Sequence, residues 1–121
     1  MKHLLWIGSS KRDLLEMPKN VISDIGHGLL EAQRGEDPSS GKILKGFRGG
    51  DVIELVINDR GGTFRSVYTV RFSEAIIVLH VFQKKSKSGI STPKKEIDLI
   101  HERLCRAESV YKDWKKGKDH G

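Results

Sequence analysis

Three apolar segments in the middle of the chain alternate between two sets of side chains, as the strands of a sheet do. They are residues 51–58, 64–72 and 75–84, and all are rich in β-branched and aromatic residues. Asp59-Arg60-Gly61-Gly62 is a hairpin turn signal between the first two, and Ser73-Glu74 makes a tight turn between the last two. The pattern therefore predicts three consecutive antiparallel strands.

A strand and two helices are predicted before these segments. Residues 2–8 predict a first strand, and Ser9-Ser10-Lys11-Arg12-Asp13 is a helix-start signal for a short helix that ends before Pro18. From Pro18 onward, the apolar residues recur at helical spacing until Gly35 and Pro38. This spacing predicts a second, longer helix.

A last helix is predicted after the strands. Thr92 and Pro93 open it as N-cap and first residue. Its apolar stripe consists of Ile97, Ile100, Leu104, Ala107 and Tyr111. Residues 115–121 are polar, and we expect them to form a frayed tail.

The predicted order of elements is β-α-α-β-β-β-α, which is an α+β arrangement. Helices on one face of an antiparallel sheet would leave the other face open. A chain of 121 residues has room for one core. We therefore expect a single domain over residues 1–121 with one exposed sheet face.

The charge of the chain is uneven. Lys and Arg outnumber Asp and Glu by 17 to 10 from residue 41 onward, whereas residues 1–40 contain 5 against 6. The run from Phe82 to Lys95, both included, contains five lysines and no acidic residue. This asymmetry favours a polyanionic partner such as nucleic acid. A lysine-rich loop that only aids solubility is the alternative interpretation.

Other features exclude several classes of protein. No apolar run approaches the roughly 20 residues of a membrane span, and the N-terminus lacks the features of a signal peptide. The lone Cys105 cannot form an internal disulfide, which fits a reducing cytoplasm. The histidines, at positions 3, 27, 80, 101 and 120, lack the spacing of a metal site, so we expect no metal or other cofactor.

Cationic side chains are conspicuous on the last two predicted strands. Strict alternation in residues 75–84 predicts one apolar face, formed by Ile77, Leu79 and Val81. The opposite face carries His80 and Lys84, and on the preceding strand Arg65 and Arg71 share a face. A rigid sheet that presents Arg, His and Lys side by side is suited to holding and cleaving a phosphodiester.

Several of these segments, taken in order, resemble the phage-derived, HigB-like branch of the RelE/ParE toxin superfamily. The resemblance covers residues 6–104 and implies a RelE-like fold and a toxin of a type II toxin–antitoxin system. The motifs that carry it are Leu44-Lys45-Gly46-Phe47, Val52-Ile53-Glu54-Leu55, Tyr68-Thr69-Val70-Arg71-Phe72, Val78-Leu79-His80-Val81-Phe82-Gln83-Lys84-Lys85-Ser86 and Thr92-Pro93.

The two sides of this superfamily imply different activities. RelE and HigB members are metal-independent endoribonucleases that cut mRNA in the ribosomal A site by attack of the RNA 2′-OH. The resemblance then implies a cytoplasmic protein whose partners are the ribosome, mRNA and a helix-turn-helix antitoxin. ParE members instead inhibit DNA gyrase without enzymatic activity, which is the alternative. The Arg, Lys and His cluster favours the nuclease.

The resemblance also suggests roles for single residues. The catalytic candidates are Arg71, His80, Lys84 and Lys85. Arg71 would stabilise charge on the scissile phosphate, and His80, whose ordinary pKa is near neutral, would transfer a proton. The RNA-binding candidates are Lys45, Arg48, Arg65 and Lys87. Structural alternatives are pairing of Arg71 with Glu54 or Glu74 and a hydrogen-bonded His80 within the sheet.

Overall fold

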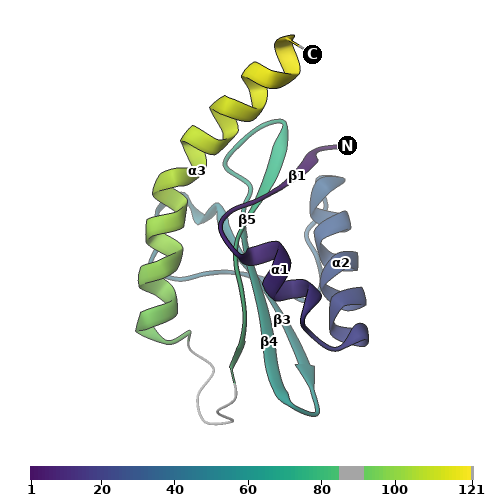
Figure 1. Cartoon of the computed structure of the whole chain (residues 1–121). Coiled ribbons are helices and arrows are strands. Elements are labelled where there is room, and N and C mark those ends of the chain that lie inside the picture. The colour runs from purple at the N-terminus through teal and green to yellow at the C-terminus, as the bar shows by residue number, and fades with distance from the viewer. Residues whose placement is uncertain (85–91, 121) are drawn as a thin grey trace.

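The computed structural model describes residues 1–84 and 92–120, and Figure 1 shows its sheet and helices. The predicted α+β class is confirmed, and most predicted elements lie within a few residues of their observed bounds. In chain order the elements are β1 (His3–Trp6), α1 (Ser10–Leu15), α2 (Lys19–Gln33), β2 (Gly41–Ile43), the 3-10 turn η1 (Arg48–Gly50), β3 (Val52–Asp59), β4 (Gly62–Thr69), β5 (Ala75–Lys84) and α3 (Lys94–His120).

The strands form one sheet of order β1-β5-β4-β3-β2. The predicted meander of β3, β4 and β5 is confirmed, with antiparallel pairing throughout. The expectation of a wholly antiparallel sheet is wrong, because β1 pairs with β5 in parallel. A further strand, β2, lies in the glycine-rich segment that gave no strand signal, and it pairs antiparallel with β3.

Helices cover both faces of the sheet, so the prediction of helices on one face only is wrong. Figure 1 shows α1 and α2 on one side of the sheet and α3 on the other. One apolar cluster joins Val21, Ile25 and Leu29 of α2 to the sheet. A second joins Ile100 and Ala107 of α3 to the opposite face. The physical reason is that β5 is apolar almost throughout, which is typical of a strand buried on both sides.

A β-bulge in β5 decides which side chains face α3. Val67 on β4 is the partner of His80, but the next residue, Tyr68, is the partner of Val78, so Leu79 is an extra residue on β5. As a result, Leu79 and His80 both face α3. Val81 instead packs with α1 and α2. The predicted apolar face of Ile77, Leu79 and Val81 is therefore wrong at Val81.

The helix α3 extends well past the edge of the sheet (Figure 1). It runs to His120, whereas the sequence predicts a frayed tail from residue 115. Aromatic rings hold its second half in place. Tyr111 stacks on Phe72 with ring centroids 4.6 Å apart, and Trp114 lies 5.0 Å from the ring of His3.

Candidate active site

A fully buried carboxylate, Glu54 on β3, lies among the polar residues on the α3 side of the sheet. Arg65 Nη1 on β4 donates a hydrogen bond to Glu54 Oε1 at 3.1 Å, and the Thr92 hydroxyl donates to Oε2 at 2.7 Å. The Lys42 ammonium lies 3.7 Å from Oε1. A buried carboxylate is destabilising unless opposite charges and donors surround it. We call these four residues the Glu54 cluster.

Strand register brings the cluster and His80 into one row. Lys42 on β2 is the partner of Glu54, Glu54 is the partner of Val67 on β4, and Val67 is the partner of His80 on β5. Paired residues point to the same face, and Arg65, two residues from Val67, does so too. The sheet therefore points Lys42, Arg65 and His80 to the face that α3 covers, with Lys42 and His80 three strand spacings apart, or roughly 14 Å.

Both ring nitrogens of His80 have partners. Nε2 is hydrogen-bonded to the Glu96 carboxylate on α3, and Nδ1 lies 3.4 Å from Arg103 Nη1. Burial, the largest influence, lowers the pKa of His80, while the hydrogen bond to Glu96 raises it. Its contacts match the structural alternative, a hydrogen-bonded histidine within the sheet. The catalytic role stays a prediction.

Arg103 ties α3 to the sheet and to the start of α1. Its buried guanidinium donates to the Leu79 carbonyl at 2.9 Å and to Ser9 Oγ at 3.4 Å. Gly8 leaves the space that this requires, since a Cβ there would lie 3.0 Å from Arg103 Nη2. Gly8 also has φ +58°, a conformation that side chains rarely adopt.

The structure does not bring Arg71 to this site. Arg71 lies two residues beyond the end of β4, and its Nε donates to Asp51 Oδ2 at 2.7 Å. This bond raises the pKa of the guanidinium further. Along the chain, Arg71 is four residues from Val67, which is the partner of His80. In an extended chain this separation is roughly 13 Å.

Two expectations about Arg71 are therefore wrong. Arg71 does not lie on a strand, and its carboxylate partner is neither Glu54 nor Glu74. Glu74 instead accepts from Lys115 and Lys118. Arg65, an RNA-binding candidate from the sequence, is the buried arginine of β4.

The other predicted residues lie on separate segments of the chain. Lys45 and Arg48 are exposed in the β2–β3 connection, where Gly46, Gly49 and Gly50 adopt positive φ. Lys84 is half-buried at the end of β5, opposite Thr63. Lys85 and Lys87 lie outside the described residues.

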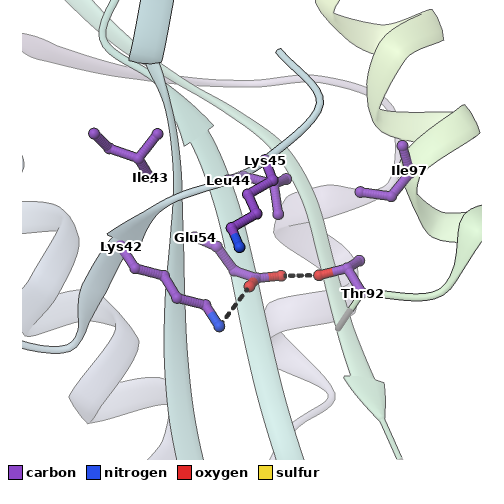
Figure 2. A pocket seen from close by; sticks show the side chains of 7 residues that line it. All are labelled: Lys42, Ile43, Leu44, Lys45, Glu54, Thr92 and Ile97. Carbon is purple, nitrogen blue, oxygen red and sulfur yellow. Dashed lines mark hydrogen bonds and ion pairs between the residues drawn. The ribbon is translucent and has the colours of Figure 1, made fainter. Parts of the chain in front are cut away.

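A pocket of about 270 Å³ opens beside the Glu54 cluster, between β2, β3 and the beginning of α3 (Figure 2). Lys42 and Lys45 approach the Glu54 carboxylate there, and Leu44 and Ile97 add apolar surface, whereas the Ile43 side chain extends to the opposite side of β2. The lining residues are Lys42, Ile43, Leu44, Lys45, Glu54, Thr92 and Ile97. Such a mixture suits a ligand with both an anionic and an apolar part.

The sequence interpretation missed Lys42, Glu96 and Arg103. Lys42 gave no signal, because β2 has only three residues in a glycine-rich segment. Glu96 and Arg103 did give a signal in the sequence. They share helical spacing with the buried Ile100 and Ala107. Charged residues at such positions of an apolar stripe indicate buried polar partners.

The described residues show neither a metal-binding group nor a membrane-spanning helix. In residues 1–84 and 92–120, no group of three His, Cys, Asp or Glu side chains is arranged to hold a metal ion. Within the same ranges, no helix has the length and apolar character needed to cross a membrane.

Comparisons with known proteins give a family and a fold. Among solved structures, the isolated RelE toxin of E. coli is similar over 86% of this chain and 99% of its own, with 15% identity and a TM-score of 0.55. The toxin–antitoxin complex RelBE2 of Mycobacterium tuberculosis matches 70% of this chain and 93% of that chain, with 17% identity and a TM-score of 0.47. No curated protein sequence matches.

The likeness to E. coli RelE, at this low identity, concerns the fold alone. It confirms the expected RelE-like arrangement. The sequence model of the family described as "Phage derived protein Gp49-like (DUF891)" matches residues 12–105, which is more than half of the chain. The protein therefore belongs to the phage-derived Gp49-like family and has a RelE-like fold.

Proposed function

We propose that the protein is the toxin of a type II toxin–antitoxin pair and that it cuts mRNA on the ribosome without a metal. The observation that carries the proposal is the group of cations on the α3 side of a RelE-like sheet. Lys42 and Arg65 share one face there, and Lys45 lies beside Lys42 and Glu54. The motif resemblance to HigB-like toxins supports the same activity.

In this cleavage reaction the central role, stabilising the charge on the phosphate, belongs to an arginine. Attack of the RNA 2′-OH on the neighbouring phosphate creates a doubly charged phosphorane, which an oriented cation stabilises. Arg65 is held in place by Glu54 and by Thr92, at 3.1 Å each. It therefore takes the role that the sequence assigned to Arg71. Lys84, and Lys85 beyond the described residues, would contact the phosphates on either side of the cut.

Access to Arg65 requires a local rearrangement. Only 3% of Arg65 is exposed, and the Thr92 hydroxyl lies 3.1 Å from its Nη1. A phosphate oxygen that binds this guanidinium takes the place of the Thr92 hydroxyl. The start of α3 must therefore move away from the sheet when RNA binds.

The proposed partners are the ribosome, its mRNA and an antitoxin with a helix-turn-helix domain, and the proposed location is the cytoplasm. Induction of the chain in bacteria should arrest growth, and co-expression of the antitoxin should restore it. Incorporation of labelled methionine should stop before that of labelled thymidine, and new mRNA 5′ ends should appear within reading frames. DNA breaks that precede any loss of protein synthesis would instead indicate a gyrase inhibitor.

A further inference from the structure

The face of the sheet opposite the Glu54 cluster carries a second pocket, with a volume of about 270 Å³. It lies beyond the end of α2, between the segment that follows this helix, β2 and the end of β4. Strand register places Ile43 of β2, Ile53 of β3 and Tyr68 of β4 in one row, so their side chains share a face. Figure 2 shows the Ile43 side chain extending away from Lys42 and Glu54. This row lines the second pocket.

A tyrosine hydroxyl without a partner lies at this pocket. Tyr68 is only 1% exposed, and its ring packs in the apolar cluster beneath α2. Among the described residues nothing forms a hydrogen bond with its hydroxyl, and this oxygen is not one of the fully enclosed polar atoms that lack a partner. The oxygen therefore reaches solvent through the pocket that Tyr68 lines. Because buried hydroxyls usually have a hydrogen-bond partner, a ligand in the pocket can supply the missing one.

The rim of the pocket is acidic. Glu36 and Asp37 line it, and neither has an ion-pair partner within 4.0 Å among the residues that the structure describes. Burial, the largest influence, and the carboxylate of Asp37 raise the pKa of Tyr68 to about 12, so the phenol is uncharged at neutral pH. Lys42 also lines the pocket, but its ammonium lies 3.7 Å from Glu54 on the opposite face. The pocket therefore favours a cation.

The walls and the volume narrow the choice of cation. Ile43, which is 62% exposed, and Val70 offer apolar surface to an aliphatic chain. The volume of about 270 Å³ lies near the lower end of the roughly 300–1,000 Å³ of small-molecule sites, which suits a group the size of one side chain. A guanidinium donates several hydrogen bonds in one plane and is more weakly hydrated than an ammonium. It can therefore contact carboxylates and a hydroxyl at once.

We infer that this pocket binds a guanidinium group on an aliphatic chain, with the guanidinium between the two carboxylates and the Tyr68 hydroxyl and the chain against Ile43. The inference goes beyond the proposed nuclease, because the pocket and the Glu54 cluster lie on opposite faces of the sheet. The group belongs either to an arginine side chain of a partner protein or to a free guanidine compound. With a net charge of +6 the protein has no general attraction for cations, so saturable binding requires a local acidic site.

NMR titration of the full chain with n-butylguanidinium chloride, at neutral pH and low salt, tests the inference. Binding should saturate with a Kd on the order of 1 mM, as expected for a ligand of so few atoms. The uncharged n-butylurea, which has nearly the same shape, should not bind. Amide signals around Asp37 and Ile43 should shift, whereas those around His80 on the other face should stay in place.

A short arginine peptide, acetyl-Gly-Arg-Gly-amide, separates the two sources of the group. If the peptide binds more tightly than n-butylguanidinium, the natural ligand is an arginine of a partner protein. If the peptide binds equally or more weakly, the ligand is a free guanidine compound.

Two variants test the groups that hold the guanidinium. Tyr68→Phe removes only a hydroxyl that has no partner in the described residues, so the fold should persist while binding weakens roughly tenfold. Glu36→Gln/Asp37→Asn removes both charges and should weaken binding at least about tenfold. Glu16→Gln/Asp24→Asn makes the same change in charge at exposed positions away from the pocket, and this matched control should bind like the wild type. Circular dichroism checks the fold of each variant.

Three results would overturn the inference: n-butylguanidinium that does not saturate, equal binding of n-butylurea, or binding that both pocket variants leave unchanged. The mRNA cleavage assay tests the other proposal separately. Both pocket variants should cleave like the wild type, because none of the changed residues contacts the Glu54 cluster. Failure of one proposal therefore leaves the other in place.

Discussion

His80 shows how a side chain suited to proton transfer is held by its neighbours. At neutral pH the lowered pKa keeps its ring uncharged. Nε2–H then donates to Glu96, and Nδ1 accepts from Arg103. A substrate proton could reach the ring only if one of these contacts broke. In this arrangement His80 therefore joins the start of α3 to the sheet.

The pKa of His80 should lie below its ordinary value of 6.5 and should fall further in Glu96→Gln, because the carboxylate raises it. At pH values between the pKa of His80 in the folded chain and its ordinary value in the unfolded chain, the unfolded chain binds more protons than the folded chain. The free energy of unfolding therefore decreases as pH falls through that window. NMR titration of the imidazole signal measures the pKa. Glu102→Gln, at an exposed position of α3, is the control. A pKa at or above 6.5 would contradict the assignment.

At the scale of elements, the three-strand meander and the helices could be predicted from periodicity and turn signals, but their layering could not. The β5 sequence alternates weakly, since Ile76, Ile77, Val78 and Leu79 are all apolar and all buried. The bulge at Leu79 leaves no trace in the sequence, yet it alone turns His80 toward α3. Local patterns therefore identified His80 as a polar residue of the strand. They could not identify its partners Glu96 and Arg103, which lie 16 and 23 positions away along the chain.

Docking of α3 should depend on Arg103. Arg103→Met removes the donor to the Leu79 carbonyl and leaves that buried oxygen without this partner, which costs about 1–3 kcal/mol. Amide hydrogens of α3 should then exchange faster, as measured by hydrogen–deuterium exchange with mass spectrometry. Arg106→Met, at an exposed position of the same helix, should leave exchange unchanged. Equal exchange in both variants would show that apolar packing alone holds α3.

At the scale of the whole molecule, α3 covers the sheet face that carries the Glu54 cluster. The charge asymmetry of the sequence indicated a cationic side, and the structure places Lys42 and Lys45 in one pocket with the buried Glu54 carboxylate, to which Arg65 is also bound. The sequence could not show this, because the contacts join β2, β3, β4 and α3 across long stretches of chain. The motif resemblance predicted the fold correctly. Its catalytic candidate Arg71 pairs with Asp51 away from the Glu54 cluster, and its role stays a prediction.

The central claim is that Arg65, and not Arg71, stabilises the scissile phosphate. The most direct measurement compares the rates at which Arg65→Lys and Arg71→Lys cleave ribosome-bound mRNA. Both variants keep the positive charge beside their carboxylate partners, Glu54 and Asp51, so both should fold. Arg65→Lys should cleave roughly 100-fold more slowly, because a lysine cannot reproduce the guanidinium geometry. Arg71→Lys should cleave like the wild type. Loss of cleavage in Arg71→Lys with a fully active Arg65→Lys would contradict the account.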